Sequence, residues 1–502
     1  MTVRLPLAIL LTMIPCASAA TPTRDDALAA LKKACTFMAE KVARNGGYFW
    51  RVSGDLKHSE GEGSTGDSMV WVQPPGTPSI GEALLDAYDA TGDAYYLKAA
   101  TRTGEALLHG QLHSGGWGYF IEFDPEKAKK FDYLGREFVR EIPPLSSEIP
   151  RIHVGWDSWK MRKNKGNVST NDDDTTQSAT RFMIRLDEAL AFKDKRIHSS
   201  ADYALDALCR SQYPAGGWSH NWDQFPLYPI REDFYPVKKA SLTDDWQRTW
   251  PKTFAGCYIT NDNLMSDMID MLARAHRVYK NEYYMAAAKK AGDFLILAQL
   301  PDPQPAWAQQ YNKEMQPEWS RAFEPPSVTG GESQSIMRTL IKLYRLTGEK
   351  KYLEPIPKAI AYLRTSLRPD GRLARFYEMN TNRPIYFNYD KEGRHQITYS
   401  DKDLPTHYGW IVDSKLDSIE KEYQAVLKLA ANELVERKGS PRMSTGLAKD
   451  TAAVIAAMDE RGAWVEPGRL KSVKGEQSSG VIESRTFIRH IETLCDFVRA
   501  SK

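Results

Sequence analysis

Four helical hairpins recur along this chain, and this internal repeat constrains the fold more than any other feature. Within each hairpin, apolar residues return at spacings of three and four, as at Leu264, Met268, Met271 and Leu272, which is the amphipathic helical period. The paired segments are 80–91 with 99–111, 176–192 with 199–212, 262–279 with 286–299, and 335–346 with 355–366. Hairpins repeating at intervals of roughly 65 to 100 residues predict an all-α fold, an α/α toroid-like barrel whose long loops form a cleft.

A turn carrying glycine, tryptophan or both follows the second helix of each hairpin, and in the first three hairpins that helix closes on a glutamine. Trp117, Trp218 and Trp307 lie in these turns, which a barrel would gather at one end. These indoles either pack the turn or form a platform for sugar rings, because the axial C–H face of a sugar packs on an aromatic surface. Trp218 and Trp307 are therefore candidate substrate-binding residues.

Residues 1–20 have the pattern of an export signal. Arg4 precedes an apolar run, 5–15, and small residues follow at 17–20. The expected location is periplasmic or secreted, and no later apolar run is long enough for a membrane span. Cys35, Cys209, Cys257 and Cys495 remain after cleavage; their spacing argues against zinc and leaves their disulfide state open.

The rest of the chain divides into an N-terminal helical segment and loop (21–77), the catalytic toroid (78–413) and C-terminal helices packed on the toroid (414–502). The clearest C-terminal helix patterns are 416–437 and 487–500. A net charge of +2 without a polybasic tract argues against nucleic acid as a partner. We expect a monomer without membrane association.

Acidic residues stand directly before two of the predicted helices. The runs are Asn171-Asp172-Asp173-Asp174 and Asn261-Asp262-Asn263. Asp and Asn cap helix starts, where they accept bonds from first-turn amides. Three consecutive aspartates exceed what one cap requires, and clustered carboxylates suit a hard cation such as calcium. Capping and metal binding both remain open.

The segment 319–333 forms a stiff arm before the fourth hairpin. Two prolines, 325 and 326, hold it extended, and Gly330-Gly331 lets it turn sharply. Arg321 and Glu324 lie three apart on this arm, so they either brace the loop as an ion pair or face a ligand. Long polar insertions at 124–169 and 221–258 interrupt the repeat, and the second is a candidate wall of the cleft.

Several motifs in this order resemble the family 10 polysaccharide lyases, the pectate lyases. The resemblance covers roughly residues 78–410 and is most specific in its C-terminal half. The motifs are Ala306-Trp307-Ala308-Gln309-Gln310, Arg321-Ala322-Phe323-Glu324-Pro325-Pro326-Ser327, Gly331-Glu332-Ser333, Ala374-Arg375-Phe376-Tyr377-Glu378 and Asn382-Arg383-Pro384.

The resemblance implies calcium-assisted β-elimination on polygalacturonate or a related acidic polysaccharide. It assigns the base to Arg321, calcium and carboxylate handling to Asp172 or Asp174 and to Asp262, and uronate binding to Arg375 and Arg383, with Glu324 beside them. An arginine acts as a base only where its surroundings lower its pKa. The chain departs from the family at 387–390, where Tyr389 stands in a region that usually supplies a further arginine.

Two other functions fit the same residues. One is a glycoside hydrolase on the same toroid, acting through paired carboxylates such as Asp174 and Glu332. The other is a polyuronate-binding protein that uses the arginines and tryptophans without turnover.

Overall fold

Inner helices pack side by side in an arc, each against the next, in the order α13, α2, α5, α7, α9 and α11. The computed structural model describes residues 21–140, 165–227, 230–252, 258–434, 439 and 441–501, so the predicted signal peptide and Cys257 lie outside the described residues. The inner helices are α2 (Thr77–Thr91), α5 (Thr175–Ala189), α7 (Leu264–Tyr279), α9 (Gly330–Thr347), α11 (Leu416–Val426) and α13 (Ser484–Ala500).

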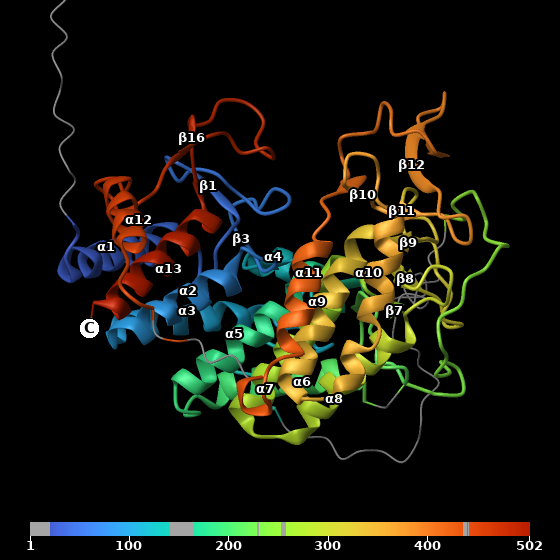
Figure 1. Cartoon of the computed structure of the whole chain (residues 1–502). Coiled ribbons are helices and arrows are strands. Elements are labelled where there is room, and N and C mark those ends of the chain that lie inside the picture. The colour runs from blue at the N-terminus through green and yellow to red at the C-terminus, as the bar shows by residue number, and fades with distance from the viewer. Residues whose placement is uncertain are drawn as a thin grey trace, which may run out of the picture.

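Outer helices cover this arc from outside, as Figure 1 shows. Three outer helices each pack on the inner helix of their own hairpin and on the next inner helix: α3 packs on α2 and α5, α8 on α7 and α9, and α10 on α9 and α11. They are α1 (Arg24–Phe37), α3 (Ala94–Gly110), α6 (Lys195–Arg210), α8 (Glu282–Leu297), α10 (Ile356–Thr365) and α12 (Thr445–Ala456); α4 (Pro125–Ala128) is a short loop helix. The predicted α/α toroid architecture is confirmed.

A glutamine that recurs in the repeat holds its turn to the following hairpin. Gln111 donates from Nε2 to the Gly115 carbonyl and to Ser200 of α6, and Gln212 donates likewise to Gly216 and to Ala287 of α8. The glutamine that closes an outer helix therefore ties its own turn to the next outer helix. Buried carbonyl groups need such donors, which explains the recurrence of glutamine at this position.

The turn tryptophans are buried packing residues, which corrects the prediction that Trp218 and Trp307 bind substrate. Trp117, Trp218 and Trp307 are each 0% exposed. Their Nε1 atoms donate back to carbonyls of the preceding outer helix, at Leu107, Leu208 and Leu295. An indole that is fully enclosed and bonded in this way offers no face for a sugar ring.

Short antiparallel strand pairs close the hairpins at one end of the toroid. Each pair joins the strand before an inner helix to the strand after the outer helix: β3 with β4, β5 with β6, β7 with β8, and β9 with β11. Their bounds are β3 (Met69–Trp71), β4 (Phe120–Glu122), β5 (Ser169–Thr170), β6 (Asn221–Trp222), β7 (Tyr258–Ile259), β8 (Gln310–Tyr311), β9 (Val328–Thr329) and β11 (Phe376–Tyr377). The N-terminal ends of the inner helices therefore meet at the strand-bearing end.

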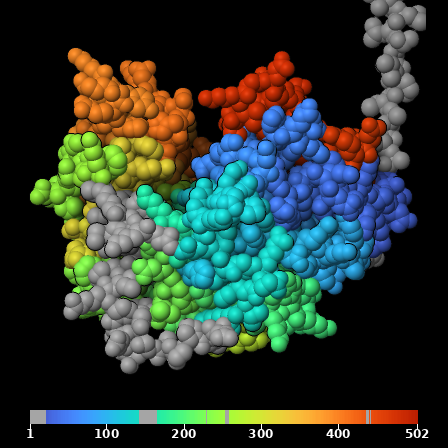
Figure 2. Space-filling view, turned by 180° about the vertical axis from the view of Figure 1, so that it is seen from behind, coloured from blue at the N-terminus to red at the C-terminus, as the bar shows by residue number. Residues whose placement is uncertain are grey.

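Two larger antiparallel sheets rise above this same end, at the upper left and upper right of Figure 1. One has the order β13-β12-β11-β9 and the other β15-β16-β1-β2, while β10 pairs with β14. The remaining bounds are β1 (Arg51–Ser53), β2 (Ser59–Glu60), β10 (Leu373–Ala374), β12 (Pro384–Tyr389), β13 (His395–Thr398), β14 (Ile411–Val412), β15 (Glu466–Pro467) and β16 (Gly480–Glu483). In Figure 2, the orange surface that includes β12 and the red and blue surface of the chain ends rise on either side of a hollow.

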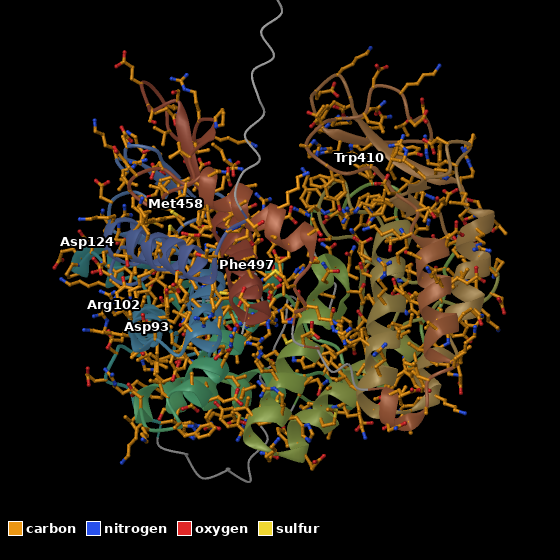
Figure 3. All side chains as sticks on the ribbon, turned by 60° about the vertical axis from the view of Figure 1, so that its left-hand side comes forward. Asp93, Arg102, Asp124, Trp410, Met458 and Phe497 are labelled. Carbon is orange, nitrogen blue, oxygen red and sulfur yellow. The ribbon has the colours of Figure 1, made fainter. Side chains whose placement is uncertain are left out.

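The two ends of the chain together build a further unit that the sequence did not reveal. Helix α1 packs on α13, and β1 pairs with β16, as in the other hairpins. Gly46-Gly47-Tyr48 forms its turn; Gly46 has φ +89° and lies so close to α3 that a Cβ would stand 2.1 Å from the Arg102 carbonyl oxygen. Figure 3 shows Arg102 in the same half of the molecule as Met458 and Phe497, far along the chain.

Another turn of this kind, Gly462-Ala463-Trp464, follows helix α12. Trp464 donates from Nε1 to Val454, ten residues earlier, as Trp117 and Trp218 do to Leu107 and Leu208. Helix α12 packs on α1 and α13, whereas α11 packs on α9 and α10 at the other end of the arc. The C-terminal helices therefore belong to the arc itself, and the helix predicted for 416–437 ends at Val426.

Among the described residues, no helix has the length and apolar character to cross a membrane. Cys35, Cys209 and Cys495 are buried free thiols.

Candidate active site

Two short 3-10 turns carry acidic residues into the strand-bearing end. They are η4 (Asp172–Asp174), which leads into α5, and η5 (Asn261–Asn263), which leads into α7. Because α5 and α7 are neighbours in the arc, the two turns lie in contact. Corresponding positions in the two turns, Asp173 and Asp262, both have φ +48°. Asp and Asn tolerate this left-handed conformation better than most residues, which accounts for their presence here.

Asp172, Asp173 and Asp262 form a three-carboxylate cluster. One oxygen of each lies within 4.8 Å of the others, a spacing that could hold a metal ion. At the starts of both turns and of α5 and α7, no side chain makes a capping hydrogen bond, so these carboxylates do not serve as caps. Of the two explanations that the sequence left open, the geometry favours the cluster over capping.

Burial and mutual repulsion raise the pKa values of two carboxyl groups in the cluster. Burial, followed by the negative charges of Asp173 and Asp172, raises the pKa of Asp262 to about 7. Burial and the adjacent Asp172 raise the pKa of Asp173 to about 6. Like charges held together disfavour ionisation, and a bound cation would relieve that repulsion.

Polar side chains from neighbouring segments contact the three carboxylates. Gln73 donates to Asp173 Oδ2 at 2.8 Å, and Tyr119 donates from its hydroxyl to Asp172 Oδ2 at 2.8 Å. The side-chain amide of Asn261 donates to Asp262 Oδ2 at 2.7 Å. His220 Nε2 lies 3.7 Å from Asp172 Oδ1. Such outer contacts fix ligand oxygens in place, as is usual around metal sites.

Asp174 is not part of the cluster, which corrects its prediction as a metal ligand. Its carboxylate points to Arg181, about two turns further along α5, and the two form an ion pair. Burial raises the pKa of Asp174, and Arg181 opposes that rise. The residue that the sequence reasoning missed in the cluster is Asp173, and the equivalent position of Asp262 in the next hairpin was the signal that could have identified it.

Arg321 and Glu324 form a two-pronged ion pair on the stiff arm. Arg321 Nε lies 2.8 Å from Glu324 Oε2 and its Nη2 lies 2.5 Å from Oε1. Glu324 is 1% exposed, whereas the Arg321 side chain is 58% exposed. The hydrogen bond to Glu324 raises the pKa of Arg321, which is the opposite of what a base requires. In this structure, Arg321 is therefore a charged side chain, paired with Glu324 at the edge of the site.

Arg375 forms a second cation beside the cluster. It donates from Nη2 to Glu332 Oε1 at 2.6 Å, at the start of α9. The ring of Tyr408 lies under both guanidinium groups, 4.7 Å from that of Arg375 and 5.8 Å from that of Arg321, and its hydroxyl donates to Glu324 at 2.9 Å. The negative charge of Asp262 contributes to raising the pKa of both arginines, so the cations and the cluster share one field.

Tyr408 and Gln309 are site residues that the sequence reasoning missed. Gln309 Nε2 lies within hydrogen-bond distance of Asn261 Oδ1, Glu332 Oε1 and the Tyr408 hydroxyl, and so connects the acidic turn to the arginine side. Gln309 lies in a motif that carries the family resemblance, while Tyr408 had no local signal. Arg383 lies elsewhere: its guanidinium covers the ring of Tyr399 at 3.6 Å, in the network around Glu378.

No protein-family model matches the sequence, and no curated protein matches it. Among solved structures, a mutant family 10 polysaccharide lyase from Cellvibrio cellulosa in complex with trigalacturonic acid is 16% identical, with a TM-score of 0.40, over 69% of this chain and 98% of that one. A cellobiose 2-epimerase from Bacillus thermoamylovorans is 11% identical, with a TM-score of 0.43, over 93% and 98%. At these values neither likeness carries an argument about activity.

Proposed function

We propose that the chain is a polysaccharide lyase that cleaves polygalacturonate or a related polyuronate by calcium-assisted β-elimination. The observation that carries this proposal is the three-carboxylate cluster of Asp172, Asp173 and Asp262, faced by Arg321 and Arg375. A site of this composition attracts a divalent cation and an anionic sugar together. The sequence motifs around both arginines support the same function.

The donor set of the cluster fits calcium. Carboxylate oxygens are the ligands that calcium prefers, and the second-layer donors Gln73, Tyr119 and Asn261 hold these oxygens in place. When bound, calcium would supply positive charge beside the uronate carboxylate and make the neighbouring C5 proton more acidic. Arg375 would bind the same carboxylate, because a guanidinium matches its planar geometry.

Arg321 is the proposed proton acceptor at C5. The step breaks the C5–H and C4–O bonds and forms the C4–C5 double bond; the proton passes to Arg321, and water protonates the leaving oxygen. Since Glu324 raises the pKa of Arg321, this role requires the side chain to leave Glu324 when substrate binds and to be neutral at that moment. Its 58% exposure leaves room for that movement.

The test is formation of unsaturated uronate, followed by its ultraviolet absorbance, on polygalacturonate with calcium or with a chelator. We expect product only with calcium, and at least a 100-fold loss of rate for Arg321→Ala, which is about the loss expected on removing one key charged group. Arg277→Ala is the matched control, because Arg277 is an exposed arginine paired with Glu188.

Other products would overturn the proposal in defined ways. Cleavage without an unsaturated product would identify a hydrolase, and binding without cleavage would identify a polyuronate-binding protein. Of these, the hydrolase finds less support because Asp174, its suggested carboxylate, is paired with Arg181.

A further inference from the structure

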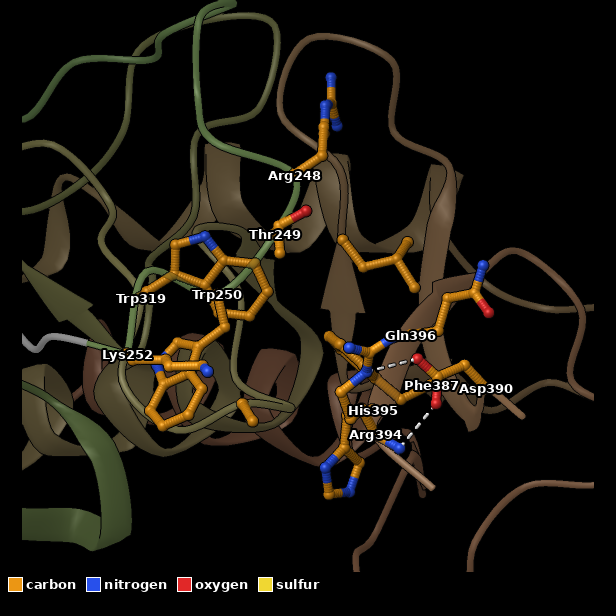
Figure 4. Close-up of a pocket in the computed structure, with 12 residues that line it drawn as sticks. Arg248, Thr249, Trp250, Lys252, Trp319, Phe387, Asp390, Arg394, His395 and Gln396 are labelled. Carbon is orange, nitrogen blue, oxygen red and sulfur yellow. Dashed lines mark hydrogen bonds and ion pairs between the residues drawn. The ribbon is translucent and has the colours of Figure 1, made fainter. Parts of the chain in front are cut away.

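We propose that a pocket beside the arm that carries Arg321 is a subsite for one hexuronate ring of the polysaccharide, which extends the proposed function and rests on it. The pocket has a volume of about 740 Å³ and lies between the segment 248–252, the arm at 319–322 and the β12–β13 hairpin. Figure 4 shows Trp250 and Trp319 on one side and the hairpin residues Arg394, His395 and Gln396 on the other. Ligand pockets typically measure about 300–1,000 Å³, so a sugar ring fits.

One wall of the pocket is aromatic and held rigidly. Trp319 donates from Nε1 to Gln247 at 2.7 Å, and Trp250 donates from Nε1 to Ser320 at 3.0 Å. Trp319 is 2% exposed and packs edge-on against Phe387, whereas Trp250 is only half-buried. Because backbone carbonyls occupy both indole N–H groups, Trp250 presents an apolar face in a fixed orientation. This is what a sugar ring needs for stacking.

The opposite wall is polar and carries positive charge at the rim. Arg394, on the hairpin turn, pairs with Asp390 at 2.8 Å and Glu392 at 2.9 Å, and its side chain remains 71% exposed. Arg248 is paired with Glu378 and is 51% exposed. A guanidinium has five N–H donors, so an arginine that already holds a carboxylate can bind a second one from another direction. Three basic residues, Arg248, Lys252 and Arg394, line the pocket against one carboxylate, Asp390, so the lining favours an acidic sugar over a neutral one.

The pocket is joined to the cluster through the arm. Ala322 lines the pocket between Arg321 and Phe323. The Phe323 ring lies 5.0 Å from His395 on the pocket side and 5.0 Å from Tyr408 on the arginine side. A polysaccharide that crosses the arm would thus place one ring on Trp250 and another beside Arg321. Trp250 and Arg248 belong to the long insertion, and Arg394 to the region where the chain departs from the lyase motifs.

Titration calorimetry with tetragalacturonate, in the presence of chelator to prevent turnover, tests the subsite on the full mature chain. We expect Trp250→Ala to weaken binding about 10-fold, or about 1.4 kcal/mol, because the sugar ring loses the aromatic face on which it stacks. Trp250→Phe keeps a ring but loses the bond to Ser320, and should weaken binding less than about 3-fold. Arg394→Gln should weaken binding by up to about 5-fold at low salt, as for an exposed charge pair.

Lys391→Gln, an exposed residue of the same hairpin turn, is the control and should bind like the unmodified chain. A carboxyl-reduced, neutral tetrasaccharide should show no effect of Arg394→Gln. Unchanged binding of tetragalacturonate by both Trp250→Ala and Arg394→Gln, with unsaturated product still formed, would overturn the subsite and leave the lyase standing. Weakened binding by both variants in a chain that forms no unsaturated product would keep the subsite and overturn the lyase.

Discussion

Asp173 and Asp174 are adjacent in the chain but have different partners. Both lie in left-handed backbone, with φ values of +48° and +60°. Asp173 faces Asp172 and Asp262, while Asp174 pairs with Arg181 on its own helix. The acidic run predicts that carboxylates meet at this helix start. It does not predict which of them face the neighbouring hairpin, because that depends on the backbone turn.

Substitutions of Asp173 and of Asp174 should change the response to calcium differently. Asp173→Asn should reduce the calcium-induced rise in melting temperature by removing a charged ligand from the cluster. At 100 times the dissociation constant, a ligand stabilises the folded state by about 2.7 kcal/mol, so the rise should be easy to measure. Asp174→Asn should keep the calcium response but lower the starting stability by about 1–3 kcal/mol, because Arg181 loses a charged partner. The reverse pattern in differential scanning fluorimetry would contradict this assignment.

Glu324 is either a brace for the loop or a working part of the site, and substitution by glutamine distinguishes the two. The side chain is 1% exposed and accepts bonds from Arg321 and Tyr408. Burial would raise the pKa of Glu324, but the hydrogen bond from Arg321 and its charge hold that pKa below its usual value. Glutamine keeps the size and loses the charge.

We expect Glu324→Gln to lower kcat/KM by about 10–100-fold, because Glu324 no longer places Arg321 at the edge of the site, the position from which Arg321 moves to C5 when substrate binds. The measurement is steady-state elimination kinetics combined with a melting curve. A lower melting temperature with unchanged kcat/KM would identify Glu324 as a brace only.

At the scale of the elements, the repeat is a strand pair, an inner helix, an outer helix and a turn locked to the next outer helix. Glycine stands at the turn where the chain must approach that helix closely. Gly46 combines φ +89° with a backbone oxygen, Arg102 O, 2.1 Å from where a Cβ would lie. This close approach defines the unit built from α1 and α13.

Gly46→Ala and Gly92→Ala form a matched pair that tests this unit. Both glycines have positive φ, but a Cβ at Gly92, at the end of α2, would meet nothing within 4 Å. Gly92→Ala should cost about 1 kcal/mol for the left-handed backbone alone. Gly46→Ala should cost more than about 3 kcal/mol, because the clash is with backbone that must shift. Urea unfolding measures both; equal costs would mean that the Gly46 turn does not need its contact with α3.

The helices were predictable because an amphipathic period is a local property, and the toroid followed from their repetition. The prediction for the turn tryptophans was wrong because two different roles give the same sequence pattern. A buried indole that donates to a carbonyl and an exposed indole that binds a sugar both place a tryptophan in the same turn. The carboxylate cluster was half predicted: Asp172 and Asp262 stand in acidic runs, while Tyr408 enters the site only through packing. The unit that α1 and α13 build was missed because these two helices are separated by almost the whole sequence.

At the scale of the whole molecule, the two ends of the chain complete the arc. Helix α13 packs on both α1 and α2, and β16 lies between β15 and β1. The buried face of α13 includes Phe487, Ile491, Leu494 and Phe497. The C-terminal helix therefore supports α2, whose neighbour α5 carries the acidic turn η4. The end of the molecule that carries the acidic cluster is therefore connected to the C-terminal helix through the adjacent inner helices α2 and α5.

A chain that ends at Glu483, and so lacks α13, should lose stability far beyond what an accessory helix would cause. Fully burying one large apolar side chain contributes about 1.5–3 kcal/mol, and α13 buries several against α1 and α2, so the total is comparable to the whole stability of a typical domain. We expect poor solubility, a broadened melting transition and loss of the calcium response.

A chain ending at Ala500 keeps α13 and is the control. Adding a peptide of residues 484–502 should restore part of the calcium response if α13 completes the arc, and the same peptide with Leu494→Asp should not. A truncated chain that melts like the control and still responds to calcium would show that the arc of α2, α5, α7 and α9 is stable without its ends.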